Sequence, residues 1–294
     1  MQYHVDGKLV DATEATVNVR DRGFMYGDAA FETLRAYGGT VLAWDAHADR
    51  LEETVETLGF AEALPPRADL HDRIVETLDA NALDDAYLKL SVTRGVQPGK
   101  LTPDTGVEPT VVVQVKALPR GGTEGESVWE EPAVLQSVKT RRIPDVAVPS
   151  DMKTHNYLNG ILARLELRKA ATEEFRADEA LMRDTDGFVV EGATSNLFFV
   201  DDGILKTPSA EQPLLPGVTR SIVIQLAREE EFPVEDGRYT VDNVREADEA
   251  FLTNSTWEIR PIASLDGIEI GSGPMTTLLA RLFDQRVESL CYGD

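Results

Sequence analysis

The sequence of 294 residues has one cysteine, eight lysines and no long apolar run. The lone Cys291 cannot form a disulfide within the chain, and no cysteines and histidines are spaced to bind zinc. No stretch is apolar for the length of a membrane span, and the first residues lack a basic and apolar leader. We therefore expect a cytoplasmic protein that needs no metal.

Positive charge is also scarce, because the chain has 29 basic residues and 52 acidic ones, which gives a net charge of −23. A field of that sign repels nucleic acid and anionic membranes, so we expect neither as a partner. The acidic residues are scattered along the chain and not gathered in a tail. We interpret them as a solvated surface adapted to high salt, with an acidic docking face for a basic partner as the less favoured alternative.

The chain is long enough for two domains, and its 42% hydrophobic residues can supply two ordinary cores. Residues 117–128 are rich in glycine and indicate a linker between an N-terminal α+β domain, residues 1–116, and a C-terminal domain, residues 129–294. Periodicity predicts strands at residues 30–37, 87–93, 110–115, 180–182, 188–190 and 249–253. It predicts helices at residues 44–59, 67–81, 158–171 and 273–290, and a further helix that opens within residues 215–220 and runs to about residue 230.

The most informative stretch runs from residue 152 to residue 200. Lys153 stands just before an amphipathic helix, and a hairpin later delivers Glu191 at the end of its second strand. Taken singly, both are more often solvated surface residues. The joint pattern is more specific, and it comprises Lys153-Thr-His-Asn156, Asp178-Glu-Ala-Leu181, Glu191-Gly192 and Ser195-Asn-Leu-Phe198.

These motifs resemble those of class IV aminotransferases, the pyridoxal 5′-phosphate (PLP) enzymes of fold type IV, and the resemblance extends through nearly the whole chain. It implies a two-domain α+β fold like that of D-amino-acid aminotransferase, with the active site between the domains. It also implies PLP as the cofactor, a small amine or amino acid as the substrate, and a homodimer.

The resemblance also implies a role for each matching residue. Lys153 would bind PLP covalently and then move the α-proton of the substrate as general base and acid. Glu191 would pair with the pyridine nitrogen, and Tyr157 would bond the ring hydroxyl. The residues expected at the phosphate are an arginine, a helix N-terminus and a hydroxyl-rich turn, namely Arg50, Val218, Thr219, Ser255 and Thr256.

Three reactions of this family compete. Branched-chain aminotransferases have a lysine loop one residue longer and an arginine where Lys89 stands, and D-amino-acid enzymes have an arginine and a histidine where Gly99 and Leu101 fall. The pattern Lys-x-x-Asn, Ser-Asn-Leu-Phe and Thr-Asn-Ser resembles 4-amino-4-deoxychorismate lyase more closely. We therefore favour that lyase, which gives 4-aminobenzoate and pyruvate. A transaminase that acts on a branched-chain L-amino acid or a D-amino acid is the alternative, and a non-catalytic PLP-binding homologue is a more remote one. The expected substrate contacts are Phe31, Lys89, Arg94, Lys100 and Trp257.

Overall fold

The computed structural model describes residues 1–120, 128–172 and 176–293. The chain divides into two compact units, which we call unit 1 (residues 1–120, 152–156 and 287–294) and unit 2 (residues 121–151 and 157–286). Most of the predicted linker, residues 121–127, lies outside the described residues. Lys153 belongs to unit 1, although it follows that linker in the sequence.

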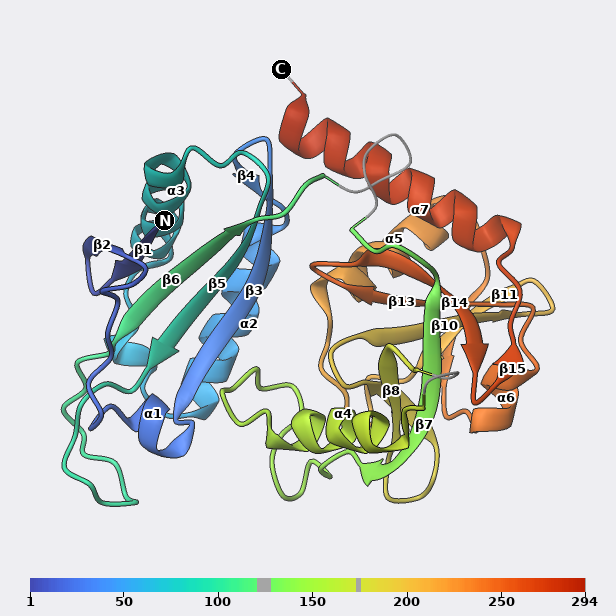
Figure 1. The fold of residues 1–294 in the computed structure, drawn as a ribbon, viewed down its shortest axis with the longest axis horizontal. Helices are drawn as coiled ribbons and strands as arrows, with labels where there is room; N and C mark the ends of the chain where they lie inside the picture. The colour runs from blue at the N-terminus through green and yellow to red at the C-terminus, as the bar shows by residue number, and fades with distance from the viewer. Residues whose placement is uncertain (121–127, 173–175, 294) are drawn as a thin grey trace. The chain divides into compact units, whose positions relative to one another are not determined.

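Unit 1 is built on a six-stranded antiparallel sheet with the order β2-β1-β6-β5-β3-β4. Two long helices, α2 and α3, pack on this sheet (Figure 1). The strands are β1 (Gln2–Val5), β2 (Lys8–Asp11), β3 (Ala29–Tyr37), β4 (Thr40–Val41), β5 (Ala86–Thr93) and β6 (Val111–Ala117). The helices are α1 (Arg22–Tyr26), α2 (Trp44–Thr57), the short 3₁₀ turn η1 (Ala61–Ala63) and α3 (Arg67–Asn81).

Alternation along β3 and β5 gives the sheet of unit 1 two different faces. Leu34, Leu88 and Leu90 are fully buried and form one core cluster with Leu51 of α2 and Ile74 of α3. The opposite face carries Phe31 of β3, which lies directly across from Ser91 of β5. One face of the sheet therefore makes the core, while the other carries Phe31 and Ser91.

Unit 2 contains a nine-stranded mixed sheet with the order β12-β11-β10-β13-β14-β7-β8-β9, and β15 pairs with β14. The strands are β7 (Ala133–Arg141), β8 (Glu179–Arg183), β9 (Val189–Gly192), β10 (Asn196–Asp201), β11 (Ile204–Pro208), β12 (Val234–Gly237), β13 (Glu249–Asn254), β14 (Glu258–Leu265) and β15 (Ile268–Glu269). The helices are α4 (Leu158–Ala170), α5 (Val218–Glu229), α6 (Val241–Arg245) and α7 (Pro274–Val287). The last residue of α7 and the π-helical turn that follows it, Glu288–Tyr292, belong to unit 1.

The core of unit 2 forms where apolar strands pack together. Phe198 of β10 and Phe251 of β13 are paired across the two strands, and their stacked rings lie 5.0 Å apart between centroids. The predicted hairpin of β8 and β9 is present and places Glu191 opposite Met182. This register fixes Glu191 at the end of a buried strand, as the sequence predicts.

Helix α4 differs from the expectation of a buried apolar face. Its buried residues are Ala163 and Leu167, whereas Leu158, Ile161, Leu162 and Leu165 are 65%, 51%, 48% and 40% exposed. The helix packs on β7 and β8 through its smaller side chains, so the leucine-rich face points away from the core of unit 2. Within the described ranges, no helix is long and apolar enough to cross a membrane.

Candidate active site

Lys153 lies in a short segment that extends the sheet of unit 1 beside the first residues of β3. The backbone N–H of Phe31 donates to the carbonyl of Lys153 at 2.9 Å, and the N–H of His155 donates to the carbonyl of Ala29 at 3.1 Å. The N–H of Lys153 donates to Oγ1 of Thr54 on α2 at 3.2 Å. The main chain of Lys153 is therefore fixed from both the sheet and the helix.

Two lysines flank the ring of Phe31. The Nζ atoms of Lys153 and Lys89 each lie 4.7 Å from its centroid. Burial, together with the positive charge of Lys153, lowers the pKa of Lys89 below its ordinary value. No described carboxylate forms an ion pair with Lys89, so this half-buried cation remains available to an anionic ligand.

His155 completes this cluster, although the sequence indicated no role for it. Its ring lies 5.5 Å from the ring of Phe31, and its Nε2 lies 3.2 Å from Oγ of Ser91. Burial, and to a lesser degree the charge of Lys89, lowers the pKa of His155 to about 4. The imidazole is therefore neutral near pH 7 and can form a hydrogen bond without adding a third positive charge.

Arg50 is held by a fully buried carboxylate on the core side of the same sheet. Its Nε and Nη2 donate to Oε1 and Oε2 of Glu32 at 2.8 and 2.6 Å, and Nδ1 of His47 lies 2.7 Å from Oε2. Burial alone would raise the pKa of Glu32, but the hydrogen bonds from Arg50 and His47 outweigh it and hold that pKa at about 2. The guanidinium is thus held in one orientation. Arg50 lies one helical turn before Thr54, the residue of α2 that contacts the main chain of Lys153.

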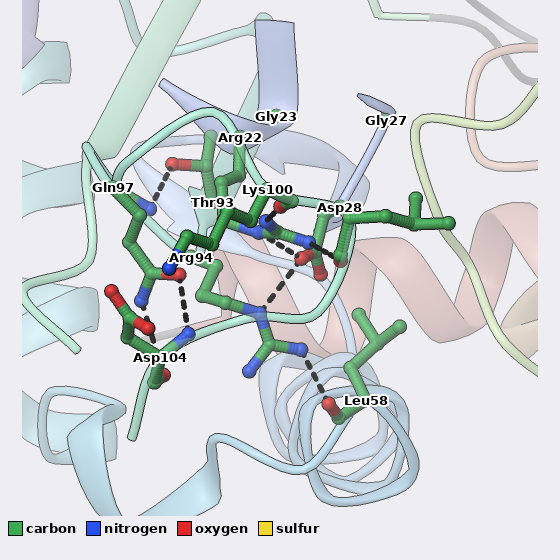
Figure 2. Close-up of polar contacts among 12 residues, drawn as sticks. Arg22, Gly23, Gly27, Asp28, Leu58, Thr93, Arg94, Gln97, Lys100 and Asp104 are labelled. Atoms are coloured by element: carbon green, nitrogen blue, oxygen red, sulfur yellow. Dashed lines mark hydrogen bonds and ion pairs between the residues drawn. The ribbon is translucent and has the colours of Figure 1, made fainter. Parts of the chain in front are cut away.

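Arg94 and Lys100 have different surroundings from the other expected substrate residues. Figure 2 shows that Arg94 and Arg22 both point to Asp28, and each Nε donates to its Oδ2 at 2.7 Å. Arg94 is 5% exposed, and its Nη2 donates to the carbonyl of Leu58 at 2.5 Å. Arg22 also donates to the carbonyl of Lys100 at 2.7 Å, while the residue Lys100 itself is exposed. These contacts fix the segment that follows β5.

Glu191 of unit 2 lies between an arginine and the loop before α5. Its Oε1 lies 2.6 Å from Nε of Arg142, and its Oε2 accepts a hydrogen bond from the N–H of Leu215 at 3.0 Å. The side chain of Glu191 is only 9% exposed. This geometry gives the carboxylate a defined plane next to the segment that leads to Val218 and Thr219.

The N-terminus of α5 fits the binding of a phosphate. Gly217 precedes the helix, and no hydrogen bond from a side chain caps it in the part of the chain that the structure describes. A Cβ atom on Gly217 would lie 2.0 Å from Oδ1 of Asn196, whose Nδ2 donates to the carbonyl of Leu215 at 3.0 Å. Asn196 therefore packs the loop so closely that only glycine fits, and it leaves the first amides of the helix for an anion.

The other expected residues of unit 2 lie at turns. Ser255 and Thr256 are half-buried between β13 and β14, and the N–H groups of Thr256 and Trp257 donate to Oδ1 of Asn254 at 2.9 and 2.7 Å. The turn is thus ordered by Asn254. Tyr157 immediately precedes α4 and is half-buried.

Comparison with known proteins identifies the family of the chain. The family model described as amino-transferase class IV matches residues 29–265. The chain belongs to the class IV aminotransferase family. A relative named "Putative branched-chain-amino-acid aminotransferase" from Methanocaldococcus jannaschii is 37% identical over 96% of this chain and 94% of its own. A D-alanine aminotransferase from Listeria innocua is 30% identical over 99% of this chain and 96% of its own.

Solved structures of the family have the same fold. The branched-chain aminotransferase from Thermoproteus uzoniensis with norvaline superposes with a TM-score of 0.87 at 30% identity, over 98% of this chain and 94% of its own. A structure named "Putative 4-amino-4-deoxychorismate lyase" from Legionella pneumophila has a TM-score of 0.81 at 25% identity, over 94% and 97% of the two chains. The predicted fold type IV is therefore confirmed.

PLP is the cofactor of class IV aminotransferases, as the resemblance predicted. Another branched-chain amino acid aminotransferase, with a TM-score of 0.86 at 27% identity over 99% of this chain and 94% of its own, has been solved with pyridoxamine 5′-phosphate. The residues of this chain fit that group. Each unit, taken by itself, contains groups suited to part of this cofactor. Unit 1 contains an amine and a fixed guanidinium, those of Lys153 and Arg50. Unit 2 contains a buried carboxylate, that of Glu191, and a helix N-terminus without a side-chain cap among its described residues.

Proposed function

We propose that this protein is a transaminase that exchanges an amino group between an amino acid and a 2-oxo acid, one of which is a dicarboxylate. The observation that carries the proposal is Lys89, a half-buried cation beside the same aromatic ring as Lys153. A buried lysine without an acidic partner is unfavourable unless an anion reaches it. A second carboxylate on the substrate would supply that charge. The branched-chain and D-alanine aminotransferases among the relatives support a transaminase.

We further propose that the site residues act as the family resemblance implies. When bound, PLP draws electron density away from the α-carbon of the amino substrate. Lys153 binds the cofactor and then removes and returns the substrate's α-proton as general base and acid. Arg50, Val218, Thr219, Ser255 and Thr256 bind the phosphate, while Glu191 and Tyr157 orient the ring. Phe31, Trp257 and Lys89 bind the substrate. We depart from the resemblance for Arg94 and Lys100, because the side chain of Arg94 and the carbonyl of Lys100 are used in internal contacts that shape the segment after β5.

A lyase acting on 4-amino-4-deoxychorismate is the second candidate. The short lysine loop favours it, because Asn156 takes the place expected from the lyase pattern and its Nδ2 donates to the carbonyl of Gly27 at 3.1 Å. That substrate also carries two carboxylates, so Lys89 would suit it equally. The structural similarity to the Legionella protein supports this candidate at 25% identity, less than the 37% of the first relative.

We also propose that the protein is a homodimer. The exposed face of α4, formed by Leu158, Ile161, Leu162 and Leu165, is a contiguous apolar stripe, because residues three and four apart lie on one side of a helix. A second copy of the chain would cover it. Light scattering in high salt should give the mass of a dimer, and Leu162→Glu should give a monomer. A wild-type monomer would contradict the proposal.

The assay for the reaction uses PLP-loaded protein in concentrated potassium chloride. One arm offers L-leucine, L-glutamate or D-alanine with a 2-oxo acid acceptor, and the other offers 4-amino-4-deoxychorismate. We expect a new amino acid in the first arm, and its loss in Lys153→Ala. Release of 4-aminobenzoate and pyruvate without any amino transfer would establish the lyase instead.

A further inference from the structure

Arg142 lies outside every motif described above, yet it contacts the carboxylate that is proposed to bind the cofactor ring. It follows β7, and its Nε lies 2.6 Å from Oε1 of Glu191. We infer that Arg142 is a positioning residue for PLP, which keeps the Glu191 carboxylate ionised and in a fixed orientation for the pyridine nitrogen. This inference rests on the proposed role of Glu191.

The main chain around Arg142 is anchored on both sides. Nδ2 of Asn159 on α4 donates to the carbonyl of Arg141 at 2.8 Å, and the N–H of Ile143 donates to Oδ1 of Asn159 at 3.3 Å. The N–H of Arg142 itself donates to the carbonyl of Arg183 on β8 at 2.9 Å. These main-chain contacts fix the position from which the side chain of Arg142 extends.

The charge of Arg142 matters because Glu191 is almost removed from water. Their side chains are 21% and 9% exposed, respectively. Burial favours the protonated form of a carboxyl group, and a protonated carboxyl cannot act as the anionic acceptor that a pyridinium needs. The nearby carboxylates make their own pairs, since Glu179 lies 3.2 Å from Arg164 and Asp184 lies 3.3 Å from Arg238. With its Nε 2.6 Å from Oε1, Arg142 is a cation placed to keep Glu191 charged.

The second oxygen of Glu191 links the ring contact to the phosphate loop. Oε2 accepts a hydrogen bond from the N–H of Leu215, two residues before Gly217 at the start of α5. With one oxygen beside Arg142 and the other on Leu215, the carboxylate plane is fixed. Arg142 thus helps to hold two cofactor contacts in one arrangement.

The test is the dissociation constant of PLP, measured by titrating apo-protein in potassium chloride at pH 8 and pH 6. For Arg142→Gln we expect binding about tenfold weaker at pH 8, the effect of losing one contact with a charged group. We expect a larger loss at pH 6, because Glu191 without its cation takes up a proton. Arg142→Lys keeps the charge and should recover most of the affinity. Arg245→Gln, which removes an ion pair with Asp266, is the matched control and should bind PLP like the wild type.

A mutant cycle shows whether the effect passes through Glu191. In a Glu191→Gln background, Arg142→Gln should cause no further pH-dependent loss of PLP affinity. If Arg142→Gln weakened PLP binding equally at pH 8 and pH 6, the inference would be overturned. The same would hold if it weakened binding as much in the Glu191→Gln background as in the wild type, and Arg142 would then have only a structural role. If Glu191→Gln alone binds PLP like the wild type, the proposed role of Glu191 fails, and this inference fails with it.

Discussion

Glu32→Gln is the perturbation that most sharply tests the electrostatics of unit 1. Glu32 has no exposed surface, and it holds both the guanidinium of Arg50 and the imidazole of His47. Glutamine keeps the size of the side chain but removes its charge. The guanidinium would then remain in a buried position without its carboxylate, which is the costly way to break a buried pair.

The magnitude follows from the pKa of Glu32, which is about 2 in the fold against an ordinary value of 4.5. A pKa difference of about 2.5 corresponds to roughly 3 kcal/mol of folding free energy at neutral pH. Because the pKa is depressed by folding, this contribution is complete above about pH 5 and is lost as the pH falls toward 2. Arg50 should also lose its fixed orientation, so the affinity for PLP should fall.

The assay is urea denaturation of the apo-protein in potassium chloride, followed by tryptophan fluorescence. Glu52→Gln is the matched control, because Glu52 pairs with Arg67 and its side chain is 45% exposed. We expect Glu32→Gln to destabilise the protein by about 3 kcal/mol at pH 7, with a gap that narrows below pH 5. The control should change stability far less. A loss of stability for Glu32→Gln as small as that of the control would show that the charge of Glu32 does not stabilise the fold.

Four further predictions concern the site and the surface. Lys89→Met should raise KM for a dicarboxylate 2-oxo acid about tenfold while leaving kcat for a monocarboxylate amino acid nearly unchanged. Lys116→Met on β6 is the control and should change neither constant. Equal KM values for Lys89→Met and the wild type would exclude the contact between Lys89 and the second carboxylate. Because burial lowers the pKa of Lys89, KM for the dicarboxylate should begin to rise at a lower pH than for an ordinary lysine. Gly217→Ala should weaken PLP binding because its Cβ would collide with Asn196, whereas Gly106→Ala, with open space around it, should bind PLP normally. Removal of potassium chloride should lower Tm markedly if the 52 acidic residues form a high-salt surface, and a Tm independent of salt would contradict that interpretation.

Much of the fold could be predicted because its elements have strong local signals. The alternation of residues 30–37 predicted β3 despite good helix formers, and the helix predicted at residues 67–81 has the bounds of α3. The strands β7 and β14 were not predicted, because neighbouring strands, and not local pattern, determine their pairing with each other and with β8. The exposed face of α4 shows the same limit, since apolar periodicity predicts a helix but not which side of it is covered.

Some residues of the candidate site have a signal in the local sequence, and others have none. Motifs led to Lys153, Glu191 and the start of α5, where residue type and order along the chain carry the signal. Glu32 had a usable signal, because period-2 alternation places it on the core side of β3, where a charge must be paired. Arg142 and His155 had no such sequence signal, because their partners are distant in the sequence. Arg142 contacts Glu191, and His155 contacts Ser91 and Phe31.

The lysine that binds the cofactor, which we propose to be Lys153, can be identified chemically. PLP-loaded protein is treated with borohydride, digested, and analysed by mass spectrometry for lysines that carry reduced cofactor. Lys89 lies at the same 4.7 Å distance from the ring of Phe31 as Lys153, so the chain contains its own internal alternative. We predict the modification on Lys153 alone among the eight lysines. Modification of Lys89, or of no lysine in protein shown to contain PLP, would mean that Lys153 does not bind the cofactor.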